Sequence, residues 1–235
     1  MQSPLVIVTG TGTGIGKTHF AAALTSKWGD AAKIMAFKPL ESGVKDIPTS
    51  DIGILNSVST FHVKPTSPLP YLFSEPISPH LASRHEQVSI NPETIIEEIL
   101  RLRSKVDGLV VELPGGLFSP LTSDLLNINL LHDLHPTMTL LVAPDRLGVL
   151  HEVISTERAA LEYPISLTGV ILNPPPQPDL STGTNAAELP AFIQTPVLGT
   201  LPRGNLADLA ESPPVQNLIK TLLAHKSSCS RTLLK

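Results

Sequence analysis

The sequence predicts an α/β fold: a single domain in which a mostly parallel β-sheet is flanked by helices on both faces. Short segments that are apolar throughout, such as residues 5–8, are typical of strands buried on both faces. Helix-prone stretches separate these segments, as parallel strands require. The chain has 235 residues, 41% of them hydrophobic, which suffices for one sizeable core.

The expected elements alternate along the chain. A strand at residues 5–8 leads through a glycine-rich turn into a helix at 17–28. Further strands are expected at 33–37, 108–112, 137–143 and 167–172, and further helices at 92–104, 147–161 and 206–223. Pro213 and Pro214 interrupt the last helix, because proline cannot continue a helix. We assign residues 1–225 to the domain and 226–235 to a polar C-terminal tail.

The composition narrows the possible partners. The formal net charge of -4 leaves no broad basic surface, so we expect no nucleic-acid partner. We find no run of about 18 apolar residues and no secretory signal, so we expect no membrane association and a cytoplasmic location. The single cysteine, Cys229, lies in the polar tail and cannot form an internal disulfide, which suits a reducing compartment.

A glycine-rich segment follows the first strand and opens the first helix. It runs Gly-Thr-Gly-Thr-Gly-Ile-Gly-Lys-Thr from Gly10 to Thr18. Because glycine permits close backbone approach, successive N–H groups and the helix N-terminus can surround phosphate oxygens. The pattern is typical of P-loop nucleoside triphosphatases, in which Lys17 would reach the β- and γ-phosphates and Thr18 would bind Mg²⁺. Gly10 and Gly16 are one residue further apart than usual, and the alternative is a flexible turn with a solvated lysine.

Charged residues stand at or near the ends of two further strands. Lys38 follows the second strand and could neutralise charge on a transferred phosphoryl group, although a strand-end lysine is often simply solvated. Glu112 ends a buried strand, where an acid is costly unless it is paired or binds a metal. Asp51 precedes an apolar segment and could be a metal ligand, or Ser50 or Asp51 could cap a helix there. These residues predict a magnesium site beside the phosphate loop.

Longer motifs resemble those of the dethiobiotin synthetase family over nearly the full length of the chain. The family's phosphate loop, Gly-Thr-Asp-Thr-x-x-Gly-Lys-Thr, has the longer spacing found from Gly10 to Thr18. Residues 70–80 are similar to the family's Pro-Tyr-x-Phe-x-x-Pro-x-Ser-Pro-His, a stretch with no general folding explanation. Shorter matches occur at 38–43, where the family has Lys-Pro-x-x-Ser-Gly, at 50–51, at 111–116, at 146–151 and at Asn173.

The resemblance implies an ATP- and Mg²⁺-dependent enzyme of biotin biosynthesis. Its substrates would be 7,8-diaminopelargonic acid and CO₂, which form a carbamate that attacks the γ-phosphate; the second amine then closes the ring of dethiobiotin. Catalysis would fall to Lys17, Lys38 and Ser42, and Mg²⁺ binding to Thr18, Asp51 and Glu112. The nucleotide would contact Gly12, Thr13, Gly14, Ile15, Gly16, Lys17, Thr18, Glu112 and Asn173. The diamine would contact Thr13, Lys38 and Ser42 and, across a homodimer interface, the helix N-terminus formed by Leu147, Gly148, Val149 and Leu150.

The sequence departs from the family in several places, among them the phosphate loop and residues 113–114, 132–136 and 174–178, which keeps other interpretations open. Gly12 replaces an Asp and Gly14 a Glu found in some members, while Leu113-Pro114 replaces Gly-Ala beside the predicted metal ligand. A degenerate paralogue that binds nucleotide without turnover is one alternative. A nucleotide-switched ATPase of the partition type is another, although positions 10–15 lack the lysine usual there. An amide-forming ligase such as cobyrinic acid amide synthetase would need a glutaminase domain, for which the sequence has no room.

Overall fold

The fold is built on a six-stranded sheet in the order β2-β5-β1-β6-β7-β8, in which all neighbouring strands are parallel. The computed structural model describes residues 2–231, with side chains described through residue 224. The strands are β1 (Leu5–Gly10), β2 (Ile34–Phe37), β5 (Gly108–Glu112), β6 (Met138–Pro144), β7 (Gly169–Asn173) and β8 (Val197–Thr200). The predicted parallel sheet in a single α/β domain is confirmed.

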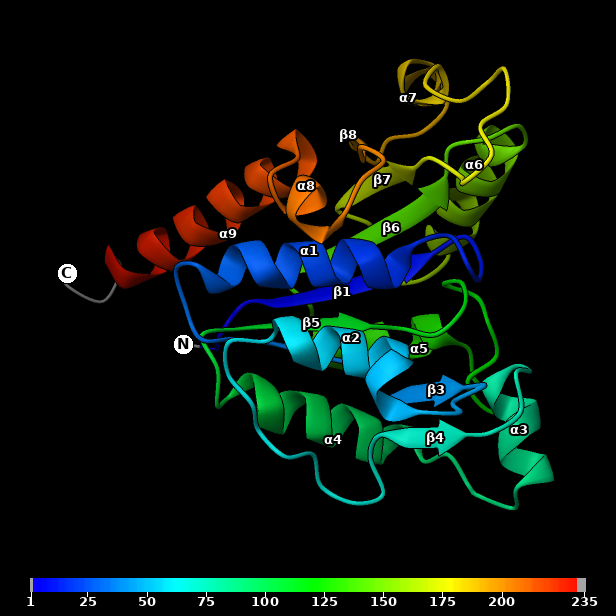
Figure 1. Cartoon of the computed structure of the whole chain (residues 1–235), viewed down its shortest axis with the longest axis vertical. Helices are drawn as coiled ribbons and strands as arrows, with labels where there is room; N and C mark the ends of the chain where they lie inside the picture. Colours follow the sequence, from blue (N-terminus) through cyan, green and yellow to red (C-terminus); the bar gives the residue numbers. More distant parts are fainter. Residues whose placement is uncertain (1, 232–235) are drawn as a thin grey trace.

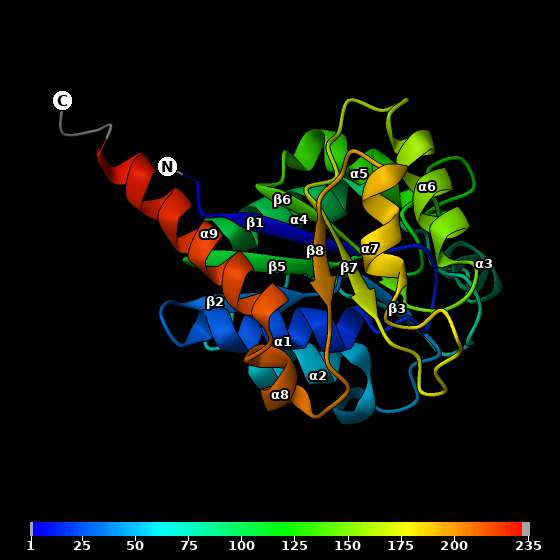
Figure 2. The ribbon, with the colours of Figure 1, turned by 90° about the horizontal axis from the view of Figure 1, so that it is seen from above.

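Helices cover both faces of this sheet (Figures 1 and 2). One face carries α1 (Lys17–Gly29), α2 (Asp51–Val58), α8 (Leu206–Ala210) and α9 (Pro213–Arg231). The other carries α4 (Pro92–Arg103), α5 (Asn127–Leu134) and α6 (Val149–Ala160). Successive β1 side chains alternate between them: Val6 and Val8 pack toward α1, whereas Leu5 and Ile7 pack toward α4 and α5. Continuous apolar strands are therefore needed to fill both cores.

A second, two-stranded parallel sheet lies beside the main one. It consists of β3 (Leu40–Ser42) and β4 (Tyr71–Phe73), and α3 (Pro79–His85) packs against both strands. Strands this short carry too little periodicity to be predicted from sequence. The sheet holds the segment after β2 against the end of the main sheet. The remaining short elements are η1 (Ile47–Thr49), α7 (Asn185–Glu188) and η2 (Leu189–Ala191).

The register of the central strands determines where polar residues emerge. Val8 of β1 pairs with Glu112 of β5, and Val111 pairs with Phe37 of β2. Glu112, the residue after Phe37 and the loop after β1 therefore leave the sheet at one edge, the carboxyl ends of the strands. Ligands of open parallel sheets bind at this edge.

The C-terminal region agrees with the predicted interruption. Residues 206–223 form two helices, α8 and the start of α9, with Pro213 at the first position of α9. Proline suits that position because its missing N–H would have no partner there. In the part of the chain that the structure describes, no helix combines the length and apolar character needed to cross a membrane. The boundary after residue 225 stays a prediction, and the side chain of Cys229 lies outside the described residues.

Candidate active site

The phosphate loop connects β1 to α1 in the predicted place. Gly14 and Gly16 have φ values of 71° and 90°, in the left-handed region that favours glycine. Lys17 begins α1, and its Nζ donates a 2.7 Å hydrogen bond to the carbonyl oxygen of Gly12, back across the loop. The lysine is thus held over the concave side of the loop, where phosphate oxygens would lie.

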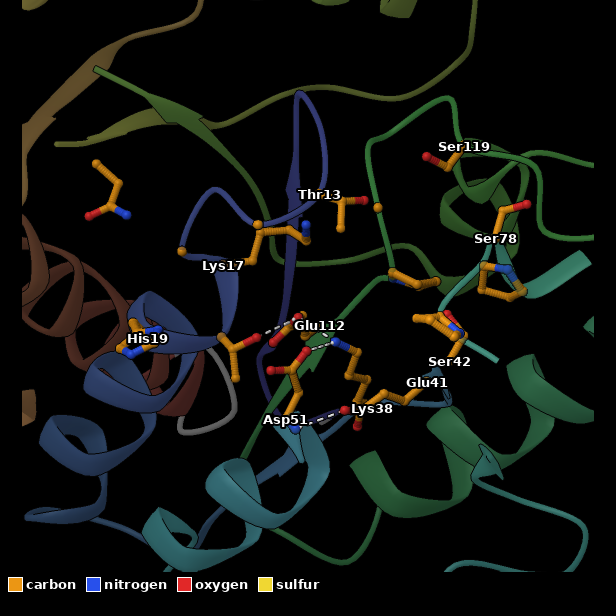
Figure 3. A pocket seen from close by; sticks show the side chains of 18 of the residues that line it. Thr13, Lys17, His19, Lys38, Glu41, Ser42, Asp51, Ser78, Glu112 and Ser119 are labelled. Carbon is orange, nitrogen blue, oxygen red and sulfur yellow. Dashed lines mark hydrogen bonds and ion pairs between the residues drawn. The ribbon is translucent and has the colours of Figure 1, made fainter. Parts of the chain in front are cut away.

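A buried ion-pair cluster stands beside this loop (Figure 3). The Nζ of Lys38 donates to Asp51 Oδ2 and, at 2.8 Å, to Glu112 Oε1. The hydroxyl of Thr18 donates to the same Glu112 oxygen at 2.9 Å. Lys38 and Glu112 are buried, whereas the Asp51 side chain is 39% exposed. Residues from four separate segments therefore meet at one sheet edge, as predicted.

The surroundings shift the pKa values of these groups. Burial lowers the pKa of Lys17 to about 8, although Glu112 partly opposes the shift. Burial alone would also lower the pKa of Lys38, but the neighbouring Glu112 and Asp51 outweigh it and raise that pKa. Lys38 is therefore a fixed cation. Burial works to raise the pKa of Asp51, yet Lys38 and Thr18 outweigh it and lower that pKa, so Asp51 is ionised.

The second oxygen of Glu112 has no hydrogen-bond partner among the described residues, although the side chain is only 1% exposed. Burial raises the pKa of Glu112, although Lys38 opposes the shift, and a buried carboxyl oxygen without a partner is costly. A hard cation would satisfy it, and Thr18 and Asp51 add the oxygen ligands that Mg²⁺ prefers. The donor set therefore fits Mg²⁺ bound by a few protein oxygens together with substrate phosphates.

The cluster lies in a cavity of about 800 Å³, a size typical of small-molecule sites. Figure 3 shows the side chains of Thr13, Ser42, Ser78 and Ser119 around this cavity. Hydroxyl groups thus line the same cavity as the two cations, Lys17 and Lys38. Further lining residues are Gly14, Gly16, His19, Glu41, Gly115, Asn173, Pro174, Pro202, Arg203 and Leu209.

Comparison with known proteins places the chain in a family. Residues 5–210 match a family described as an AAA domain. The "ATP-dependent dethiobiotin synthetase BioD" of Rhodopirellula baltica is 32% identical over 216 residues, which cover 85% of this chain and 84% of the relative. That of Ralstonia nicotianae is 33% identical over 201 residues, or 83% and 87% of the two chains. The chain belongs to the AAA-domain family and to the ATP-dependent dethiobiotin synthetases.

Solved structures of other proteins share the fold of this synthetase family member. A ParA family ATPase from Chlorobium tepidum superimposes with a TM-score of 0.57 at 15% identity and covers 94% of this chain and 98% of its own. The septum site-determining protein MinD from Pyrococcus horikoshii, complexed with Mg-ADP, gives 0.55 at 17% identity, with 94% and 95% covered. At such low identity the likeness shows the fold alone.

The remaining predicted nucleotide residues lie at the loop or at the end of β7. Asn173 ends β7, and its Nδ2 donates to the carbonyl oxygen of Ile15 at 2.9 Å. A Cβ on Gly16 would lie 2.0 Å from that Nδ2, so glycine is required for the contact. Asn173 thereby connects the last turn of the phosphate loop to the sheet.

The predicted carboxylate-binding segment is not part of this cavity. None of Leu147, Gly148, Val149 and Leu150 lines it, and Leu147 is 77% exposed. The segment forms the start of α6, with Gly148 as the N-cap. Its predicted role in a partner's site stays a prediction.

Sequence reasoning missed several residues that build the cavity. The carboxylate of Glu41 accepts the backbone N–H groups of Asp51 and Ile52. Buried Asn127 donates to the carbonyl oxygens of Pro114 and Gly116, and thus shapes the turn after β5. Glu41 could have been noticed as an acid within the Lys-Pro-Leu-Glu-Ser-Gly motif. Asn127 gives no sequence signal, because it acts across the fold from α5.

Proposed function

We propose that this chain converts 7,8-diaminopelargonic acid, CO₂ and ATP into dethiobiotin, ADP and phosphate. Membership of the ATP-dependent dethiobiotin synthetases supports this proposal. The observation that carries it is the arrangement of Lys38 between Asp51 and Glu112, next to Lys17 and Thr18 of the phosphate loop. Two cations and two acids beside a triphosphate-binding loop suit transfer of a phosphoryl group to an anionic oxygen.

The first steps make and activate a carbamate. One amine of the substrate adds to CO₂ and loses a proton, which leaves a carbamate anion. The Ser42 hydroxyl would donate a hydrogen bond to that anion, and Lys38 would offset its charge, which their shared place in the cavity lining supports. A carbamate oxygen then attacks the γ-phosphorus of ATP, the bond to the β-phosphate oxygen breaks, and ADP leaves. Lys17 stabilises charge on the transferring group.

The last step closes the ring. The second amine attacks the carbonyl carbon of the carbamoyl phosphate, inorganic phosphate leaves, and the nitrogen loses its proton. The hydroxyls of Thr13 and Ser42 would hold the reacting groups near one another, which is supported by the cavity that both residues line. Mg²⁺, held by Thr18, Asp51 and Glu112, would neutralise charge on the β- and γ-phosphates.

The proposal extends to the nucleotide site and the assembly. The loop from Gly12 to Thr18 would hold the phosphates, and Asn173 would contact the base. We further propose a cytoplasmic homodimer with no nucleic-acid or membrane partner, in which the α6 N-terminus of each subunit binds the diamine's carboxylate at the partner's site. Helix N-terminal N–H groups suit a carboxylate.

Phosphate release measured with ATP, Mg²⁺, bicarbonate and diaminopelargonate tests the proposal. We expect phosphate and dethiobiotin to form in equal amounts and only when the diamine is present. Phosphate release that is indifferent to the diamine would instead identify a nucleotide-switched ATPase. Nucleotide binding with no release would identify a degenerate paralogue, for which the Leu113-Pro114 departure is the best argument.

A further inference from the structure

Glu41 is a buried acid inside the cavity that none of the preceding chemistry uses. It lies in the middle of β3, is 8% exposed and lines the cavity between Lys38 and Ser42. Its place in the Lys-Pro-x-x-Ser-Gly motif is one of the variable positions. Its function must therefore be derived from its contacts in this chain.

Both carboxylate oxygens of Glu41 are used at the start of α2. Oε1 accepts the N–H of Asp51 at 2.8 Å (Figure 3). Oε2 accepts the N–H of Ile52 at 2.9 Å. Separately, the Ser50 hydroxyl caps the helix by accepting the N–H of Gly53 at 3.1 Å. The Ser50 cap accepts only one of the N–H groups that the start of a helix leaves without a partner. Glu41 adds a tertiary connection from β3 to the first turn of α2.

This connection bears on Asp51 more than on Glu112. Glu112 is fixed within β5, whose backbone is hydrogen-bonded to β1 and β2. Asp51 instead begins a short helix that follows the 3-10 helix η1, and its side chain is the more exposed of the two acids. The Lys38 ammonium donates to the Asp51 carboxylate, and the Glu41 carboxylate accepts the Asp51 backbone N–H. Two residues of one short segment therefore bind both the side chain and the backbone of Asp51.

We propose that Glu41 is a positioning residue that fixes the Asp51 carboxylate for Mg²⁺ binding beside the phosphate loop. Hydrogen bonds accepted by Glu41 fix the start of α2, just as strand pairing within the main sheet fixes Glu112. Residues that orient metal ligands typically change metal affinity or activity about 10–100-fold when removed. The inference rests on the nucleotide and metal part of the proposed function, and not on the identity of the diamine.

The test compares Glu41→Ala and Glu41→Gln with the wild-type chain. Binding of a non-hydrolysable ATP analogue is titrated calorimetrically at several Mg²⁺ concentrations, without diamine or bicarbonate, and the melting temperature is measured in parallel. We expect Glu41→Ala to need about 10–100-fold more Mg²⁺ for half-maximal enhancement of analogue binding. Glu41→Gln retains one acceptor oxygen, so its Mg²⁺ requirement should lie between those of Glu41→Ala and the wild type.

Asn91→Ala is the matched control. The Asn91 side chain accepts the N–H of Thr94 at 2.9 Å and caps α4, and Asn91 does not line the cavity. This variant should lower the melting temperature and leave the Mg²⁺ requirement unchanged. If Glu41→Ala behaves in the same way, Glu41 is only a helix cap and the proposal is wrong. If Glu41→Ala does not fold, the proposal is overturned when Glu41→Gln needs the same Mg²⁺ concentration as the wild type. The proposal is also overturned if the wild type binds the analogue equally well with and without Mg²⁺.

Because no diamine is present, these outcomes are separate from those of the phosphate-release assay. A chain that fails to make dethiobiotin but binds the analogue with Mg²⁺ can still show the effect of Glu41. Conversely, normal dethiobiotin synthesis with an unchanged Mg²⁺ requirement in both Glu41 variants would remove only the positioning role.

Discussion

Two regions of the molecule differ in how their predicted residues are bonded and buried. One is the ion-pair cluster at the end of the central strands, and the other is the start of α6. Around Lys38, the predicted residues Thr18, Asp51 and Glu112 are buried or half-buried and are hydrogen-bonded to Lys38 or to one another within the same chain. At the start of α6, the predicted residues are outside the cavity and Leu147 extends into solvent. The groups that we propose for phosphoryl transfer thus meet within one chain, whereas the segment that we propose for the substrate's carboxylate lies outside this cavity.

The difference shows which demands the fold meets by itself. Transfer of a phosphoryl group needs charges held at fixed positions, and a parallel sheet provides these because several strands end at one edge. A long substrate also needs a contact distant from the reacting atoms. In the proposed homodimer, that contact comes from the α6 start of the partner subunit, so the two regions should respond differently to mutation.

Removal of the Lys17 cation should produce the largest effect on activity. We expect Lys17→Met to lower kcat for dethiobiotin formation by at least about 10²–10³-fold, the usual loss when one group that stabilises transition-state charge is removed. The measurement is diamine-dependent phosphate release at saturating substrates. Lys27→Met is the control, because Lys27 pairs with Asp30 and Glu211 at the other end of α1 and should leave kcat unchanged. Near-normal kcat in Lys17→Met would remove Lys17 from the mechanism.

Introducing a negative charge at the start of α6 should have a smaller effect on activity than the loss of Lys17. We expect this change to weaken only the binding of the diamine substrate. We expect Leu147→Glu to raise KM for diaminopelargonate about tenfold, because a like charge opposes the substrate's carboxylate. The KM for ATP and the melting temperature should not change, since Leu147 is exposed and outside the cavity.

Mixing the two variants then tests whether the site is shared between subunits. A mixed dimer of Lys17→Met and Leu147→Glu contains one site with both halves intact. After unfolding and refolding together, the mixture should regain about a quarter of wild-type activity at low diamine, because half of randomly paired dimers are mixed and each has one intact site. Activity no higher than the average of the separate variants would show that α6 serves its own chain or no site.

The last prediction concerns stability and pH rather than activity. Burial lowers the pKa of Lys17 to about 8 in the folded chain, below the ordinary value of 10.5. Between these values the unfolded chain binds more protons, so stability rises with pH across this window. The cost of burying the cation is fully present below pH 8. Without nucleotide, Lys17→Met should therefore exceed the wild type in unfolding free energy by about 3 kcal/mol at pH 7, and the gap should close as pH rises from 8 toward 10.5. A pH-independent gap in denaturant unfolding would contradict this.

Much of the fold could be predicted because local hydrophobic and glycine patterns in the sequence indicate its strands and turns. Apolar strands such as the one ending at Glu112 indicate that both faces of the sheet are buried. The glycine-rich loop before Lys17 indicates a strand-to-helix turn with space for phosphate. The two-stranded sheet of β3 and β4 could not be predicted, because its strands are three residues long and their pairing joins segments far apart in the chain.

By itself, the sequence determined the α/β class, the phosphate loop and the types of residue at the strand ends. Strand direction and hydrophobic periodicity are local properties, so Lys38 and Glu112 could be assigned to one sheet edge in advance. Only the tertiary structure decided that Lys38 binds both acids, that Asn127 shapes the turn after β5 and that Glu41 holds the start of α2. These contacts depend on register, crossover and side-chain direction between distant segments, and local sequence preferences do not encode them.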